Sequence, residues 1–222
     1  MTLDPDLFET APQLEIRVDK LGGKIPVILA DNVYLRPDAV REAALKLSFE
    51  PPPYPYPGSL AVPGGANPSL TALTRKVLAI VNSEYLPRVP IAQDGRRIEA
   101  FQTVFTDFAK IDVHPDELSD LQRIPHTDPV PIFGLIYLNR EERGGTLFFQ
   151  QRAEVQAGAG GKGYLTESTE GFELVGRIPA AFNRLAIYPG FVPHSGEIAG
   201  DWIRGEERFR SPRLTQRLVF FS

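Results

Sequence analysis

Residues 126–139 read His126-Thr-Asp-Pro-Val-Pro-Ile-Phe-Gly-Leu-Ile-Tyr-Leu-Asn139 and place a histidine and a carboxylate just before a strongly apolar segment. The segment Ile132–Asn139 is short and rich in β-branched and aromatic residues, which predicts a buried strand. Residues two apart in an extended chain point to the same side, so His126 and Asp128 can converge on one metal ion. Ligands at the edge of a buried sheet are held rigidly, as metal chemistry requires.

A third ligand is predicted at His194, in the stretch Tyr188-Pro-Gly-Phe-Val-Pro-His-Ser-Gly196. It follows the predicted strand Arg184–Tyr188, and the flanking Pro193 and Gly196 suit a tight approach to a site. Two histidines and one carboxylate with open coordination positions are the arrangement of non-haem Fe(II) oxygenases. Taken alone, such a pattern often arises by chance.

The chain has only three histidines, and the remaining one also lies in a His-x-Asp pattern, His114-Pro-Asp116. Proline followed by acidic residues is typical of the first turn of a helix, where alternate residues do not share a face. We therefore expect a structural role for His114.

The composition limits the class of protein. With 222 residues the chain fits one domain, 1–222. The 19 Gly and 21 Pro favour short strands joined by loops, and 42% hydrophobic residues provide a core. A net charge of −4 gives no field that would attract nucleic acid or anionic lipid. The absence of Cys excludes disulfides and Cys-ligated zinc. Because there is neither a signal-peptide pattern nor a membrane-length apolar run, we expect a soluble, cytoplasmic protein without a membrane partner.

The predicted fold class is α+β, mainly β, with two parts in one domain. Residues 1–95 form a helical, mixed support, with a strand at Ile25–Ala30 and helices that begin at Pro37 and at Asn67-Pro68. Residues 96–222 form a sandwich or barrel of short antiparallel strands. The strands expected there are Ile98–Phe108, Ile132–Asn139, Thr146–Gln151, Arg184–Tyr188 and Arg213–Phe221.

Two segments have a biased composition. The proline-rich stretch 51–57 could bind a proline-recognition domain, but Tyr54 and Tyr56 favour burial, so we expect an extended loop against its own domain. The glycine-rich stretch 158–163 lacks the residues of a phosphate loop, because Gln156 and Gly163 occupy two of its defining positions. We expect a surface loop or lid there, and substrate contacts from the loops at 50–66 and 152–170.

Four ordered motifs resemble the 2-oxoglutarate/Fe(II)-dependent dioxygenases, particularly the prolyl-hydroxylase-like group. Phe133–Asn139 and Gly144–Phe148 are similar to that group's strand ending Tyr-Leu-Asn and its Gly-Gly turn. Phe182–His194 is similar to the strand that leads to its distal histidine, and Arg213–Thr215 to its Arg-x-Ser/Thr on the last core strand. The matches cover about residues 120–221. The resemblance implies a double-stranded β-helix (jelly-roll) core with supporting N-terminal helices.

The resemblance also implies the ligand set. His126, Asp128 and His194 would bind Fe(II), Arg213 would pair with the distal carboxylate of 2-oxoglutarate, and Thr215 would add a hydroxyl. Fe(II) with one aspartate keeps a net charge of +1, which suits a dianionic cosubstrate. The far carboxylate is then buried and needs a cation that also donates hydrogen bonds.

Two further residues are candidates for binding 2-oxoglutarate. Tyr137 would be a second hydrogen-bond donor to the same carboxylate. Arg217 shares a strand face with Arg213 and is its rival; we favour Arg213 because Thr215 accompanies it. For both arginines a surface ion pair with Glu206 or Glu207 is the alternative.

The implied function is an Fe(II)- and 2-oxoglutarate-dependent oxygenase that uses O2, releases succinate and hydroxylates an unactivated C–H of an amino acid, peptide or small metabolite. Because relatives that halogenate lack the carboxylate ligand, Asp128 favours hydroxylation. Two alternatives stay open. One is a cupin-like metal-binding jelly roll with other chemistry, which would not need Arg213 and Thr215, and the other is a non-catalytic binding domain that retains the fold.

Overall fold

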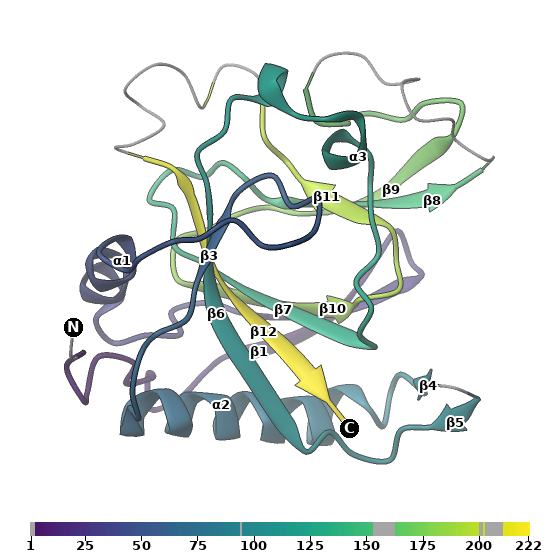
Figure 1. Ribbon diagram of the computed structural model, residues 1–222. Coiled ribbons are helices and arrows are strands. Elements are labelled where there is room, and N and C mark those ends of the chain that lie inside the picture. The colour runs from purple at the N-terminus through teal and green to yellow at the C-terminus, as the bar shows by residue number, and fades with distance from the viewer. Residues whose placement is uncertain (1–2, 94, 153–162, 200–201, 203–210) are drawn as a thin grey trace.

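Two antiparallel sheets form the body of the protein (Figure 1). The larger sheet has seven strands in the order β1-β2-β10-β7-β12-β6-β3, and the smaller has three in the order β11-β8-β9. In chain order these are β1 Ile16–Leu21, β2 Ile25–Ala30, β3 Ser59–Ala61, β6 Thr103–Ile111, β7 Ile132–Tyr137, β8 Thr146–Gln151, β9 Phe172–Ile178, β10 Arg184–Pro189, β11 His194–Gly196 and β12 Arg213–Phe221. The computed structural model describes residues 3–93, 95–152, 163–199, 202 and 211–222.

Helices cover the outer face of the larger sheet. Figure 1 shows α2 (Pro68–Ile80) lying across β6 and β12, with α1 (Pro37–Leu45) to one side. As predicted, Asn67 begins α2, and its side chain accepts a hydrogen bond from the Leu70 amide at 3.0 Å. A π-helical turn, Val81–Tyr85, continues α2. The short α3 (Asp120–Arg123) and the hairpin of β4 (Ala92–Gln93) and β5 (Arg96–Arg97) lie outside both sheets.

Strand β12 separates the core from the candidate site. Its even-numbered apolar residues Leu214, Leu218 and Phe220 pack in the main core with the α2 side chains Leu73 and Val77. Its odd-numbered residues lie on the opposite face because successive side chains alternate, and Arg213, Thr215, Arg217 and Val219 line a cavity there. A second apolar cluster joins the two sheets, with Leu135 and Phe148 among its members.

Most predicted strands are confirmed. Ile25–Ala30, Thr146–Gln151 and Arg213–Phe221 have the predicted bounds, and the strands at 132 and 184 differ by one or two residues at one end. The strand predicted at Ile98–Phe108 is wrong at both ends, because β6 begins only at Thr103 and runs to Ile111. Ahead of it, the buried Phe101 exchanges two backbone hydrogen bonds with the Asn82 side chain, at 2.9 and 3.0 Å, instead of pairing with a strand.

The N-terminal support contributes strands as well as helices. Strands β1, β2 and β3 all belong to the larger sheet, where β2 pairs with β10 and β3 with β6. The sequence analysis did not predict β1, although residues 14–19, Leu-Glu-Ile-Arg-Val-Asp, alternate apolar and polar side chains; the strand lies at the edge of the sheet and is mostly exposed. The molecule is therefore α+β and mainly β, as predicted.

The two biased segments have different outcomes. The proline-rich stretch 51–57 is irregular chain beside the sheets, and Tyr56 is half-buried, but Tyr54 is 49% exposed, so its predicted burial is wrong. The predicted glycine-rich loop at 158–163 lies outside the described residues except for Gly163. In the described part of the chain, no helix is long and apolar enough to cross a membrane.

Candidate metal centre

The three predicted ligands lie together. One ligand atom from each of His126, Asp128 and His194 can be chosen so that all three are within 4.8 Å of one another. The backbone fixes this arrangement, because the two histidines form an antiparallel bridge: His126 N–H donates to the His194 carbonyl at 2.9 Å, and His194 N–H donates back at 2.8 Å. His194 begins β11 and pairs with Phe148 of β8.

A close backbone contact places the carboxylate. The Asp128 amide donates to the Gly190 carbonyl at 2.8 Å, which aligns residues 126–128 with the loop that leads to His194. A Cβ at position 190 would lie 2.2 Å from the Val130 carbonyl oxygen, so only glycine permits this approach. The glycine at position 190 is thus required for the backbone contact that places Asp128 beside the loop leading to His194.

The protonation of the site suits a metal cation. His194 Nδ1 lies 2.8 Å from the Val192 carbonyl oxygen, which can only accept, so Nδ1 donates this hydrogen bond and Nε2 is the ring nitrogen that faces Asp128. Desolvation, with a smaller contribution from neighbouring His194, lowers the pKa of His126 to about 4, although part of that residue is exposed where it lines the cavity. Neutral imidazoles are the form that binds metals.

The carboxylate supplies the strongest sign of fit. Asp128 Oδ2 is buried and has no hydrogen-bond partner within the described part of the chain, and it lies 3.2 Å from His194 Nε2. A metal cation between this oxygen, His194 Nε2 and His126 would give the buried carboxylate oxygen a favourable partner. The described group can therefore hold a metal ion.

The triad lies on the wall of a cavity of about 710 Å³ that also contains Arg213. The Arg213 side chain is 5% exposed, and its Nε donates to the Gly144 carbonyl at 2.8 Å. Its two terminal nitrogens have no hydrogen-bond partner in the described part of the chain. Gly144 has a φ of +79°, and a Cβ there would lie 2.5 Å from the Trp202 ring, so glycine is required beside this arginine.

Unpartnered hydroxyls surround this end of the cavity. The hydroxyl oxygens of Tyr164, Ser195 and Thr215 are buried without a hydrogen-bond partner among the described residues, and all three residues line the cavity. Burial raises the pKa of Tyr164 well above its usual value, so its hydroxyl stays a donor. Sequence reasoning found Thr215 but missed Tyr164 and Ser195, although Ser195 directly follows the ligand His194.

Tyr137 and Arg217 lie differently from Arg213. Tyr137 is fully buried but is not among the lining residues, and its hydroxyl shares a 2.7 Å hydrogen bond with Thr146, which does line the cavity. Its role as a direct donor stays a prediction. Arg217 lines the cavity, but both carboxylate oxygens of Asp107 accept hydrogen bonds from it. Burial alone would lower the pKa of Arg217, but the bonds to Asp107 outweigh it and raise the pKa.

Two other predictions concern residues away from the triad. His114 is at the start of a short 3₁₀ turn, Pro115–Glu117, and its Nδ1 accepts a hydrogen bond from the Asp116 amide at 3.2 Å, in agreement with the predicted structural role. The alternative ion pairs of Arg213 and Arg217 with Glu206 or Glu207 involve residues outside the described chain.

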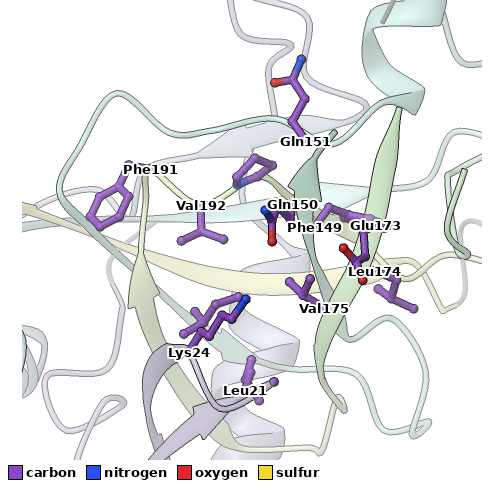
Figure 2. A pocket seen from close by; sticks show the side chains of 13 residues that line it. Leu21, Lys24, Phe149, Gln150, Gln151, Glu173, Leu174, Val175, Phe191 and Val192 are labelled. Carbon is purple, nitrogen blue, oxygen red and sulfur yellow. The ribbon is translucent and has the colours of Figure 1, made fainter. Parts of the chain in front are cut away.

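A second groove, of about 640 Å³, lies where the hairpin of β1 and β2 meets β8 and β9 of the smaller sheet (Figure 2). Lys24, Glu173 and the 58% exposed Phe191 are among its lining residues, and none of the three predicted ligands lines it. The cavity with the triad is therefore the candidate functional site.

Comparisons with known proteins place the chain in a family without assigning its chemistry. No curated protein matches the sequence. Among solved structures, the chain is similar to a bsmA homologue from Methylobium petroleophilum, with 16% identity, a TM-score of 0.33, and coverage of 94% of this chain and 77% of the other. Residues 12–159 and 151–220 match a family of unknown function, DUF6445. The chain belongs to the DUF6445 family.

Proposed function

We propose that this protein is an Fe(II)- and 2-oxoglutarate-dependent oxygenase that hydroxylates an unactivated C–H bond. The observation that carries the proposal is one cavity with a two-histidine, one-carboxylate group and a buried arginine whose terminal nitrogens lack partners among the described residues. Two imidazoles and one carboxylate suit non-haem Fe(II). The buried guanidinium suits the far carboxylate of a dicarboxylate that binds the iron with its other end.

The fold supports the same assignment. The larger and smaller sheets face each other around an apolar cluster, and the triad lies where the smaller sheet's β11 meets residues 126–128. We assign this arrangement to the double-stranded β-helix, or jelly roll, with β12 as the last core strand. In this assignment Arg213 and Thr215 start that strand beside the metal ligands.

The chain's own residues divide the work between them. His126, Asp128 and His194 would hold iron, which when bound supplies O2 activation coupled to oxidation of 2-oxoglutarate to succinate and CO2. Arg213 would orient the cosubstrate with its two terminal nitrogens. Thr215 and the other unpartnered hydroxyls would donate hydrogen bonds to the same carboxylate, which offsets the cost of burying it.

Succinate formation tests the proposal. Protein loaded with Fe(II) is incubated with 2-oxoglutarate in air against a panel of candidate substrates, and succinate is measured. We expect turnover in the wild type and in His114→Ala, a histidine outside the cavity, and none in His194→Ala. A folded, iron-loaded wild type that forms no succinate with any substrate would contradict the oxygenase. Turnover of a substrate without 2-oxoglutarate would favour the cupin-like alternative.

A further inference from the structure

The cavity is longer than the metal centre and its neighbouring arginine require. Arg213, Thr215, Arg217 and Val219 follow one another along the cavity face of β12. Alternate residues of a strand are about 6.8 Å apart, so this row extends for about 20 Å. A five-carbon dicarboxylate that reaches from Arg213 to the triad would leave the lining beside Arg217 and Val219 unfilled. The triad adjoins that lining, because Phe133, which pairs with Val219, has its ring centroid 6.4 Å from that of His194. The part of the cavity beside Arg217 and Val219 is here called the outer half.

The outer half carries no free charge among the described lining residues. Its one charged lining residue is Arg217, and Asp107 neutralises it through two hydrogen bonds. The Arg217 guanidinium also lies 5.7 Å from the Tyr56 ring centroid and donates to the Tyr54 hydroxyl at 3.3 Å. Every nitrogen of this guanidinium thus has a partner within the protein, so it is unlike Arg213.

Apolar side chains form the remainder of this wall. Val219 pairs with Phe133 of β7, and both line the cavity. Leu121 of α3 lines it too and is 58% exposed, and Ile124 follows in the same segment. The proline-rich stretch contributes further lining with residues 54–57. Large apolar residues are seldom gathered around an open space unless something apolar fills it.

We propose that the outer half binds the substrate and that the substrate group it selects is an uncharged, apolar organic group of a small molecule. The substrate assignment rests on the proposed oxygenase function. A free amino acid would bring an ammonium and a carboxylate into a wall that offers neither a free anion nor a free cation, and burying unpaired charges is costly. An uncharged apolar molecule gains from the same wall through burial of its surface. The volume of about 710 Å³ suits a drug-sized ligand in addition to the cosubstrate.

The proposal gives the proline-rich stretch a role. The Arg217–Asp107 pair links β12 to β6, and the contacts of Arg217 with Tyr54 and Tyr56 attach the stretch to that pair. Both tyrosines line the cavity, so in this proposal they form part of the wall that contacts the substrate.

A matched pair of fluorescent probes tests the selection directly. N-phenyl-1-naphthylamine is uncharged, and 8-anilino-1-naphthalenesulfonate has the same rings with one sulfonate added. Binding is measured in Arg213→Gln, which removes the free cation at the inner end, and in the wild type. Trp202 is the chain's single tryptophan and lies against Gly144 near Arg213, so energy transfer from it reports a probe in this cavity. We expect the uncharged probe to bind Arg213→Gln at least about tenfold more tightly than the sulfonate.

Substitutions in the wall locate the probe. Val219→Asp places a charge in the outer half and should weaken binding of the uncharged probe by about tenfold or more. If Val219→Asp does not fold, Leu121→Asp serves in its place, because Leu121 is 58% exposed. Leu35 is 52% exposed and lines neither described cavity, so Leu35→Asp is the matched control and should bind the probe as the wild type does.

The outcomes separate the two proposals. Probe binding needs neither iron nor 2-oxoglutarate, so absence of succinate would contradict the oxygenase while leaving the apolar selectivity intact. Equal binding of both probes to Arg213→Gln, or full affinity for the uncharged probe in both Val219→Asp and Leu121→Asp, would overturn the assignment of the outer half. Faster succinate formation with a free amino acid than with any uncharged apolar compound would overturn it as well.

Discussion

Arg213 and Arg217 lie four residues apart on the same face of β12, and both line the cavity, yet they are in opposite situations. Asp107, which is 3% exposed, neutralises Arg217 within the protein. Arg213 donates only to a backbone carbonyl among the described residues and keeps its charge available. The difference teaches that partners, rather than residue type or position along a strand, determine whether a buried arginine stabilises the fold or binds a ligand. The Arg213 end of the cavity therefore has a cation available for a ligand, whereas the Arg217 end does not.

The largest effect is expected from removing a metal ligand. The wild type should bind about one Fe(II)-class ion per chain. His126→Ala or His194→Ala should abolish this binding, because the two protein ligands that remain cannot compete with water for the ion. Metal content after anaerobic loading measures the result. His114→Ala is the matched control and should retain the ion. If His126→Ala still binds metal with wild-type affinity, His126 is not a metal ligand.

The next effect concerns stability at the outer end. Arg217→Ala leaves the buried Asp107 carboxylate without its cation and should lower the free energy of unfolding by about 3–5 kcal/mol. Urea denaturation measures the loss. The double variant Arg217→Met/Asp107→Leu removes both charges and should recover most of the stability. If Arg217→Ala is as stable as the wild type, the ion pair with Asp107 does not stabilise the fold, and Arg217 does not differ from Arg213 in the way described.

For 2-oxoglutarate affinity, substitution of Arg213 should have a larger effect than substitution of Arg217. Arg213→Ala should weaken 2-oxoglutarate binding by about 2–4 kcal/mol, the range for a buried charged group that loses its partner. Metal affinity should stay nearly unchanged, because Arg213 is not a ligand. Titration calorimetry on metal-loaded protein measures both. Arg217→Lys, which keeps the charge beside Asp107, should bind 2-oxoglutarate almost as the wild type does, and a larger loss there than in Arg213→Ala would move the carboxylate's partner to Arg217.

A pH effect should appear at the candidate metal centre of the metal-free protein. The pKa of His126 is lowered in the fold to about 4 from a usual 6.5, so the unfolded chain takes up this proton more readily than the folded one. The contribution of His126 to stability is therefore complete above about pH 6.5 and is lost as the pH falls toward 4. The difference in Tm between wild type and His126→Gln, followed over this range, isolates the effect. A difference that does not change with pH would contradict it.

The smallest effect is expected at Thr215. Its buried hydroxyl has no partner, so Thr215→Val, which keeps the shape, should leave the unfolding free energy of the free protein within about 0.5 kcal/mol or raise it slightly. In the presence of 2-oxoglutarate the same variant should lose about 1 kcal/mol of binding energy. Denaturation with and without 2-oxoglutarate compares the two. A clear loss of stability in the free protein would show that the hydroxyl has a structural partner.

Much of this site follows from short-range sequence patterns. The His-x-Asp spacing, the apolar run after it and the distal histidine predicted a group that the structure brings together. The strands β8 and β12 were equally predictable, because one buried face and turn residues at each end specify them. The predicted roles of these residues in binding iron and 2-oxoglutarate stay predictions.

Other features depend on long-range pairing that no local pattern reveals. Ser195 and Tyr164 matter because their hydroxyls lack partners, which depends on every residue packed around them. The Arg217–Asp107 pair depends on the register of β12 against β6, in which these two residues are directly opposite. β1 is a different case, because residues 14–19 alternate apolar and polar side chains and so carried a strand signal that the sequence analysis missed.

The backbone bridge between His126 and His194 also bears on how the protein folds. These residues are far apart in the chain, so the site forms only after distant segments have come together, a step that long-range β topologies take slowly. A partly folded chain, in which the loop before β11 is still free, would have no complete set of ligands. Metal would therefore bind the native state selectively, and the midpoint of thermal unfolding should rise with metal concentration. The same linkage makes chelation a way to expose this region to proteases before the rest of the molecule opens.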